Sequence, residues 1–256
     1  MDFYITRYSE NSNSEINELY RSAIWRVLSS EERLDALQEL ENRAAEKLGN
    51  QPCEICTEEM NGSQYGYYYN GKIYVNESLI NNGTLRYVDE TGNVLEYIPN
   101  DTNAQMMDTI HHENYHAYQN EVIHGWLEHN DQQEIELWRA NEDMYISSSD
   151  NGILYRIQSQ ERTAFDRGEQ QTKIAFEELE SKYGDDAGYQ EYLTSINQDS
   201  YKNALTEAQE MYEDENIQET LDFYMVSSYM ENHADESELV SDIYTSDEID
   251  ESNLSP

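Results

Sequence analysis

The residues best suited to chemistry are two histidines and a glutamate in the stretch His112-Glu113-Asn114-Tyr115-His116. Residues four positions apart lie on the same face of a helix, so the imidazoles of His112 and His116 can bind one metal ion. Glu113 lies about 100° further round that helix. Its carboxylate can therefore reach a metal-bound water without becoming a ligand itself. The spacing predicts a metal site with a general base beside it.

The helix that carries these residues is expected to run from about residue 104 to residue 123. On a helical wheel His112, Glu113 and His116 share a polar stripe, and apolar side chains spread over the remaining girth. Such a helix is largely buried, so its polar stripe must face a cleft or a partner. His111 projects to the far side and is predicted to be a packed or hydrogen-bonded histidine and not a ligand.

A second helix, expected over residues 153–182, has a carboxylate on its apolar face. Glu161 lies in the middle of a stripe of Leu, Ile, Ala and Phe side chains. A carboxylate in that position costs roughly several kcal/mol unless it is paired or bound to a metal. Arg162 and Arg167 project elsewhere on the same helix, so a group outside the helix must neutralise Glu161.

A catalytic zinc ion takes three protein ligands and keeps one position open for water. His112 and His116 supply two ligands, and Glu161 is the expected third, so the predicted cofactor is Zn²⁺. The alternative is that the two histidines are ordinary side chains of their helix that bind no metal, and that a salt-bridge partner neutralises Glu161.

The charge balance is the most unusual property of the composition. The chain of 256 residues has 54 acidic and 15 basic residues, which gives a formal net charge of −39. Such a surface repels nucleic acid and anionic membranes, and it favours basic partners or basic peptide substrates. The charge can also serve only to keep the protein soluble.

The sequence shows no apolar run of about eighteen residues, so no membrane span is predicted. The first residues lack a basic region followed by an apolar one, so no signal peptide is predicted. We therefore expect a cytoplasmic protein as synthesised, with export by a route that uses no such signal as the alternative.

The remaining patterns predict an α+β fold that is mostly helical, with a small antiparallel or mixed sheet. Helices are expected over residues 11–48 and 189–230, and the strands lie between residues 53 and 98. The clearest strand signal is a hairpin with an Asn70-Gly71 turn. Residues 1–230 are expected to form one domain, followed by an acidic, mobile tail over residues 231–256. Cys53 and Cys56 form a lone CxxC pair and are interpreted as structural thiols.

Two motifs together resemble the gluzincin metallopeptidases, whose third zinc ligand is a glutamate on a downstream helix. They are His112-Glu113-x-x-His116 and Gln158-x-x-Glu161. The chain is particularly similar, over roughly residues 50–180, to small HExxH domains of bacterial effector and toxin-like proteins and mobile elements. Thermolysin-like members have an aspartate four residues after the third ligand, where this chain has Phe165. The third histidine of the metzincins is also missing.

The resemblance implies a zinc endopeptidase with a narrow protein substrate, in which Glu113 is the general base on the zinc-bound water. It also implies a tyrosine, histidine or arginine that stabilises the oxyanion. Candidates for this role are Tyr155, Tyr224 and His233. A peptide substrate would add to an edge strand of the hairpin, and residues 72–75 are the expected edge.

The alternative function is an acidic binding protein, such as a DNA mimic that captures a basic partner. It rests on the net charge and is compatible with residual zinc binding. Neither hypothesis predicts an oligomeric state, and neither includes nucleic acid or a membrane as a partner.

Overall fold

The computed structural model describes residues 16–60, 62, 64–88, 91–198 and 200–233. It is an α+β fold made mostly of helices, with a small mixed sheet and a separate antiparallel hairpin, so the predicted fold class is confirmed. In chain order the elements are η2 (Glu18–Tyr20), α2 (Ser22–Trp25), α3 (Ser30–Leu48), β1 (Glu54–Glu58), β2 (Gly66–Tyr69), β3 (Lys72–Asn76), α4 (Glu77–Asn82), β4 (Leu85–Val88), β5 (Val94–Tyr97), α5 (Thr102–Ile123), α6 (Gln132–Asp143), α7 (Gly152–Ile157), α8 (Ser159–Tyr183), α9 (Ala187–Gln198), α10 (Tyr201–Tyr212) and α11 (Ile217–Asn232).

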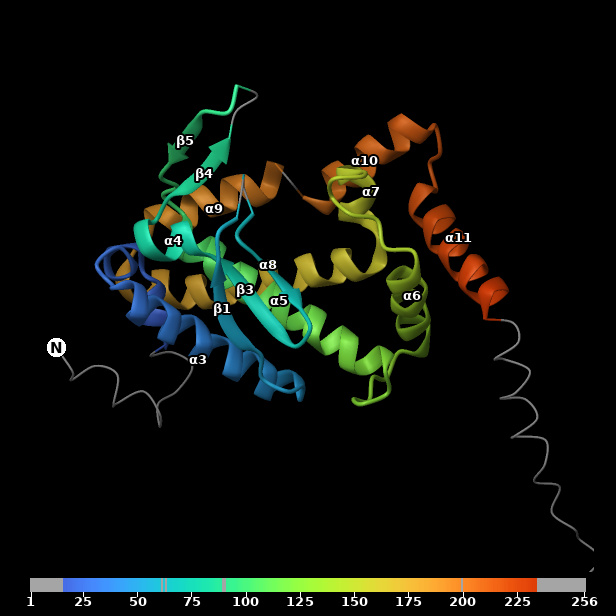
Figure 1. Ribbon diagram of the computed structural model, residues 1–256, viewed down its shortest axis with the longest axis horizontal. Helices are drawn as coiled ribbons and strands as arrows, with labels where there is room; N and C mark the ends of the chain where they lie inside the picture. Colours follow the sequence, from blue (N-terminus) through green and yellow to red (C-terminus); the bar gives the residue numbers. More distant parts are fainter. Residues whose placement is uncertain (1–15, 61, 63, 89–90, 199, 234–256) are drawn as a thin grey trace, which may run out of the picture.

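Helix α5 forms the centre of the molecule (Figure 1). It packs most extensively against α8, and it also contacts α3, β2, α9 and α6. Met106, Met107 and Ile110 are completely buried in the main core, which α5 shares with the sheet, α3, α8 and α9. A helix with neighbours on so many sides has little solvent-facing surface, as the apolar girth of its sequence predicted.

The mixed sheet has the strand order β1-β3-β2. β2 and β3 form the predicted hairpin, and Asn70 and Gly71 both have positive φ, as a two-residue turn of this kind requires. β1 pairs with β3 in parallel. Because β3 therefore has a neighbour on both sides, the prediction that residues 72–75 form the sheet edge was wrong. The free edge near α5 belongs to β2.

The second hairpin, β4–β5, projects from the body of the molecule in Figure 1. Its strands agree with those expected from the sequence. All four residues of β5 are exposed.

The C-terminal half is more finely divided than the sequence indicated. The helix expected over residues 153–182 breaks at Gln158, whose backbone is extended, so that α7 and α8 are separate. The stretch 189–230 contains three helices, α9, α10 and α11. α6, α7, α10 and α11 share a second, smaller core on the right of Figure 1. Most of the expected tail, residues 234–256, lies outside the described residues.

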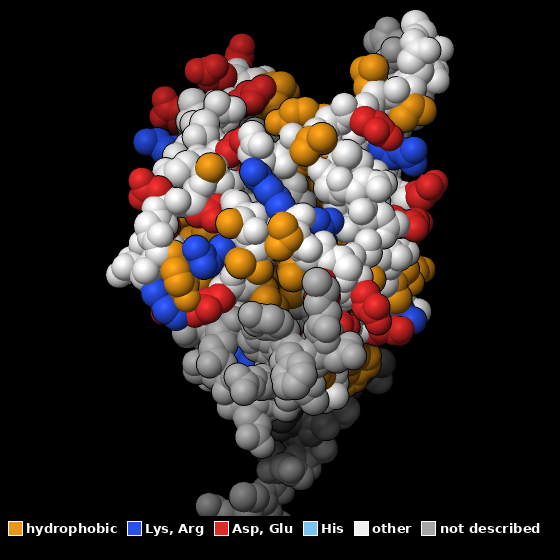
Figure 2. Space-filling view, turned by 90° about the vertical axis from the view of Figure 1, so that its left-hand side faces the viewer, with side chains coloured by type: hydrophobic (Ala, Val, Ile, Leu, Met, Phe, Trp, Pro, Cys, Tyr) orange, Lys and Arg blue, Asp and Glu red, His pale blue; other side chains and the backbone are white. Residues whose placement is uncertain are grey.

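Charged side chains on the face in Figure 2 are mixed with apolar ones. Acidic groups are scattered over this face, with several Lys and Arg side chains between them. None of the helices in the described part of the chain combines the length and the apolar character needed to cross a membrane.

Gly66 permits the close approach of β2 to α5. A Cβ atom at Gly66 would lie 2.7 Å from the carbonyl oxygen of Tyr74 and 2.8 Å from Cγ2 of Thr109 on α5. Contacts below 3.0 Å are not tolerated by Cβ atoms, so the strand can lie against this turn of α5 only because residue 66 has no side chain.

We therefore expect Gly66→Ala to lower the free energy of unfolding by about 1–3 kcal/mol, because β2 and α5 must separate. Gly152→Ala is the matched control, since a Cβ there would meet nothing within 4 Å; it should change stability by at most about 0.5 kcal/mol. Urea unfolding of both variants measures the difference. Equal stabilities would contradict the close approach.

Candidate metal centre and cleft

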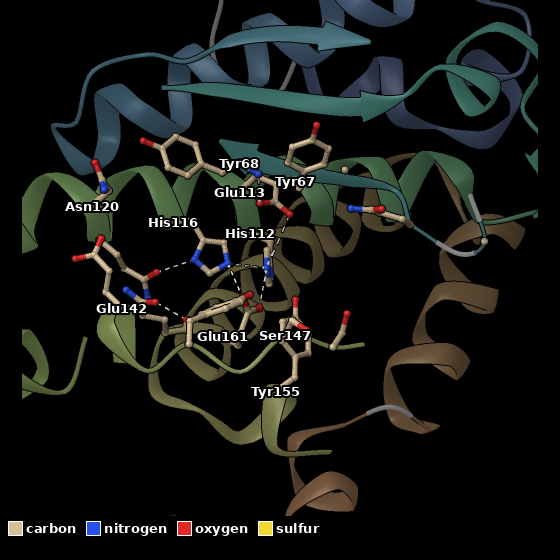
Figure 3. Close-up of a pocket in the computed structure, with 17 residues that line it drawn as sticks. Tyr67, Tyr68, His112, Glu113, His116, Asn120, Glu142, Ser147, Tyr155 and Glu161 are labelled. Atoms are coloured by element: carbon tan, nitrogen blue, oxygen red, sulfur yellow. Dashed lines mark hydrogen bonds and ion pairs between the residues drawn. The ribbon is translucent and has the colours of Figure 1, made fainter. Parts of the chain in front are cut away.

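A cleft of about 720 Å³ lies between β2, α5 and the segment from residue 142 to residue 161 (Figure 3). It brings together the four residues singled out in the sequence. His112, Glu113 and His116 point into it from α5, and Glu161 faces them from the first turn of α8.

Three of these residues form a triangle, called the donor triangle below, whose corners are Nε2 of His112, Nε2 of His116 and the carboxylate group of Glu161. Nε2 of His112 is 3.1 Å from Nε2 of His116. Glu161 places Oε2 3.4 Å from Nε2 of His112 and Oε1 3.3 Å from Nε2 of His116. Ligand atoms that bind a tetrahedral zinc ion at about 2.0–2.1 Å are themselves about 3.3 Å apart. Each imidazole nitrogen therefore lies at the spacing of zinc ligands from the other imidazole and from one oxygen of Glu161. Two nitrogens with one carboxylate form a donor set that suits zinc.

Glu161 is only 1% exposed, yet its surroundings favour the charged form of the carboxyl. Burial opposes the charge of this carboxyl, but the neighbouring rings of His116 and His112 hold its pKa well below the usual range. The hydroxyl of Tyr145 donates a hydrogen bond of 2.5 Å to Oε1. Oε2 is buried and has no hydrogen-bond partner among the described residues, so it remains free to bind a cation.

Burial lowers the affinity of His116 for a proton, but the Glu161 carboxylate outweighs this effect. The pKa of His116 is raised to about 9 by that carboxylate, with smaller contributions from Glu113 and Gln119. Without metal, a proton on His116 therefore supplies the positive charge that neutralises Glu161 at neutral pH.

The break at Gln158 explains the position of Glu161. The buried amide of Gln158 accepts hydrogen bonds from Nδ2 of Asn141 and the backbone N–H of Ile146, and it donates one to the Ile146 carbonyl. These bonds join the start of α8 to the end of α6. Glu161 thus lies in the first turn of α8, where the helix dipole stabilises a negative charge.

Gln119 orients His116. Its Nε2 donates to the carbonyl oxygen of Gln160 and to Oγ1 of Thr163, at 3.0 Å and 2.8 Å. Oε1 of Gln119 is therefore left to accept from Nδ1–H of His116, 2.8 Å away. In the neutral ring this arrangement leaves the lone pair on Nε2, the atom that faces the cleft.

Glu113 lies next to the donor triangle: its carboxylate and the ring nitrogens of His112 and His116 lie within 4.8 Å of one another, close enough to share an ion. Its Oε2 accepts the backbone N–H of Tyr68 on β2 at 2.7 Å, and its Oε1 is 4.0 Å from Nε2 of His112. The hydrogen bond fixes the carboxylate at the rim of the site, where it can act on a water molecule near the ion. His111 is outside this group: burial lowers its pKa to about 3, and Arg167 and Lys47 are its charged neighbours.

Of the three residues expected to stabilise the oxyanion, one lines the cleft and two lie outside it. Tyr155 lines the cleft. Tyr224 is 59% exposed on α11, and His233 lies 3.6 Å from Asp143, both outside the residues that line the cleft. Sequence reasoning missed Tyr145, because a tyrosine in an irregular loop has no periodic signal that could indicate its direction.

Comparisons with known proteins identify no similar protein. None of the protein-family models, curated protein sequences or solved structures compared with this chain gives a significant match.

Zinc affinity is expected to depend on pH, because His116 must lose its proton to bind a metal ion. Since the pKa of His116 lies at about 9, each ion displaces about one proton below that pH. The apparent affinity should therefore rise about tenfold per pH unit between about pH 6 and about pH 8. Competition with a chromophoric chelator, corrected for the chelator's own protonation, measures it. An affinity that does not change with pH would contradict the charged His116–Glu161 pair.

Proposed function

We propose that this protein is a zinc-dependent peptidase in which His112, His116 and Glu161 bind the metal and Glu113 is the general base. The observation that carries the proposal is the close approach, in an open cleft, of two Nε2 atoms 3.1 Å apart to the Glu161 carboxylate, whose two oxygens lie 3.4 Å from His112 and 3.3 Å from His116. A structural ion would be enclosed by four protein ligands, whereas three ligands and an open side are typical of catalytic zinc.

When bound, zinc would supply a Lewis acid that polarises a peptide carbonyl and makes water acidic. The protein residues move the proton. Glu113 accepts a proton from the attacking water and delivers it to the leaving amine nitrogen as the peptide bond breaks. Its Oε2 is already bonded to the Tyr68 amide, so Oε1 is the oxygen left for this transfer.

Tyr155 supplies a hydroxyl group on the side of the cleft away from β2 (Figure 3). Burial, together with the nearby Glu161 carboxylate, raises the pKa of this phenol, so it remains a protonated donor at neutral pH. A hydrogen bond from such a donor stabilises the negative charge that develops on a carbonyl oxygen during attack. The proton of the Tyr145 hydroxyl is already donated to Oε1 of Glu161, so Tyr145 positions that carboxylate instead.

The substrate we propose is an extended peptide segment with basic side chains. The free edge of β2 lies along the cleft, and an extended peptide can pair with such an edge. Glu142 lies at the end of the cleft near Asn120 (Figure 3). Neither Lys nor Arg occurs among the described residues that line the cleft. This local charge, and the net charge of −39, favour a cationic substrate.

Glu113→Gln is expected to lower cleavage by about 10²–10⁴-fold, because the amide cannot accept a proton. Zinc content should be unchanged, since Glu113 lies outside the donor triangle. Glu136→Gln, at an exposed site on α6, is the matched control. Cleavage of a mixed library of quenched fluorescent peptides measures both variants. Full activity in Glu113→Gln would refute the proposed mechanism.

The second candidate is an acidic protein that captures a basic partner, and only the net charge favours it. It predicts salt-sensitive binding of a basic probe such as protamine that is unchanged in His116→Ala. The peptidase hypothesis predicts cleavage that this substitution abolishes. A peptidase whose acidic surface helps to bind its substrate would show both properties.

A further inference from the structure

The two histidines of the donor triangle differ in how their second nitrogen is bonded. Nδ1 of His116 has Gln119 as its acceptor. Nδ1 of His112 is buried and has no hydrogen-bond partner within the described chain. A histidine that binds a metal almost always donates its other N–H to a carboxylate, a carbonyl or a water, because this bond fixes the tautomer and the ring orientation. His112 therefore lacks a visible acceptor.

Asp108 is the candidate acceptor. It lies four residues before His112 on α5, and residues at this spacing lie on the same face of a helix. Its Oδ1 is buried and also has no partner in the part of the chain that the structure describes. Burial raises the pKa of Asp108 to about 7, and the charge of the neighbouring His112 ring opposes that rise.

The Asp108 carboxylate lies in the space that a side chain at Gly168 of α8 would occupy. A Cβ atom on Gly168 would lie 2.3 Å from Oδ1 of Asp108 and 3.0 Å from its backbone oxygen. Any larger residue at position 168 would force this carboxylate to move or the two helices apart. The close contact holds Asp108 against α8, about two helical turns after Glu161.

Tyr192 of α9 is completely buried near the same carboxylate, and the completely buried Thr172 of α8 is a neighbour of Tyr192. The Tyr192 hydroxyl is near enough to lower the pKa of Asp108, although it lacks the geometry of a formed hydrogen bond. Among the described residues, both hydroxyls lack a hydrogen-bond partner, as do Nδ1 of His112 and Oδ1 of Asp108. Unpaired buried polar atoms are rare, and a group of them is usually bridged by ordered water.

We propose that Asp108 is a positioning residue for the metal centre. Its carboxylate accepts the Nδ1–H of His112, directly or through one buried water, and so keeps the lone pair on the Nε2 that faces the cleft. Tyr192 and Thr172 donate to the same carboxylate or the same water. The inference rests on the proposed zinc site. It concerns a residue that orients one of the ligands and not the identity of the ligands.

Asp108→Asn tests this role, because it keeps the shape of the side chain and removes its charge. We expect zinc affinity to fall about 10- to 100-fold. The metal-free variant should unfold at the same temperature as the wild type or higher, because a poorly solvated carboxylate has been removed. A merely structural residue would give the reverse pattern, with lower thermal stability and unchanged affinity. Asp101→Asn, at a buried carboxylate that precedes the same helix, is the control and should retain full zinc affinity.

A spectroscopic measurement on the zinc-loaded wild type observes the proposed hydrogen bond of His112 itself. Nitrogen-15 NMR should show a slowly exchanging Nδ1–H on His112 that Asp108→Asn shifts or removes, whereas Gln119→Leu should change only the corresponding signal of His116. A rapidly exchanging Nδ1–H on His112, or unchanged zinc affinity in Asp108→Asn, would overturn the inference. Wild-type protein that binds no zinc would instead refute the proposed function, and the role of Asp108 with it.

Discussion

The structure depends on one buried charge, the carboxylate of Glu161. It lies 1% exposed between two helices, where an unpaired negative charge would be strongly destabilising. Two imidazoles on α5 and one tyrosine hydroxyl surround it, and the pKa of Glu161 stays well below its usual range, against the effect of burial, because those imidazoles are close. In our proposal, the same groups that neutralise the carboxylate bind a divalent cation. The contact between α5 and α8 is therefore both the centre of the fold and the candidate active site.

The neighbouring helices and strands hold the contact between α5 and α8 in place, and they leave a cleft on one side of it. Gln158 and Asn141 join α8 to α6, so that the first turn of α8 points its acid at α5. Gly66 lets β2 approach α5 closely enough for the Tyr68 amide to hold Glu113. Gln119 and, in our proposal, Asp108 hold the two histidine rings from behind. Rigid support of this kind keeps the donor atoms at metal-binding distance before an ion arrives.

The sequence predicted the parts of this arrangement that depend on periodicity and charge. The four-residue spacing of His112 and His116 places both on one face, and the buried acid at Glu161 required a partner that its own helix lacks. The hairpin followed from Asn70-Gly71. Features that depend on contacts between distant segments were missed: the parallel pairing of β1 with β3, which makes β2 the edge, the break at Gln158, and the direction of Tyr145. Each is decided by side-chain hydrogen bonds or strand pairing across many residues, for which a local pattern contains no signal.

The metal content of the purified protein tests the central claim most directly. Elemental analysis of wild type, His112→Ala, His116→Ala and Glu161→Ala, after identical purification and dialysis, measures how many zinc ions each chain retains. Our account predicts about one zinc ion per wild-type chain and almost none in each variant, with the fold retained by circular dichroism. Wild-type protein without zinc in a buffer that supplies it, or full zinc content in Glu161→Ala, would contradict the account.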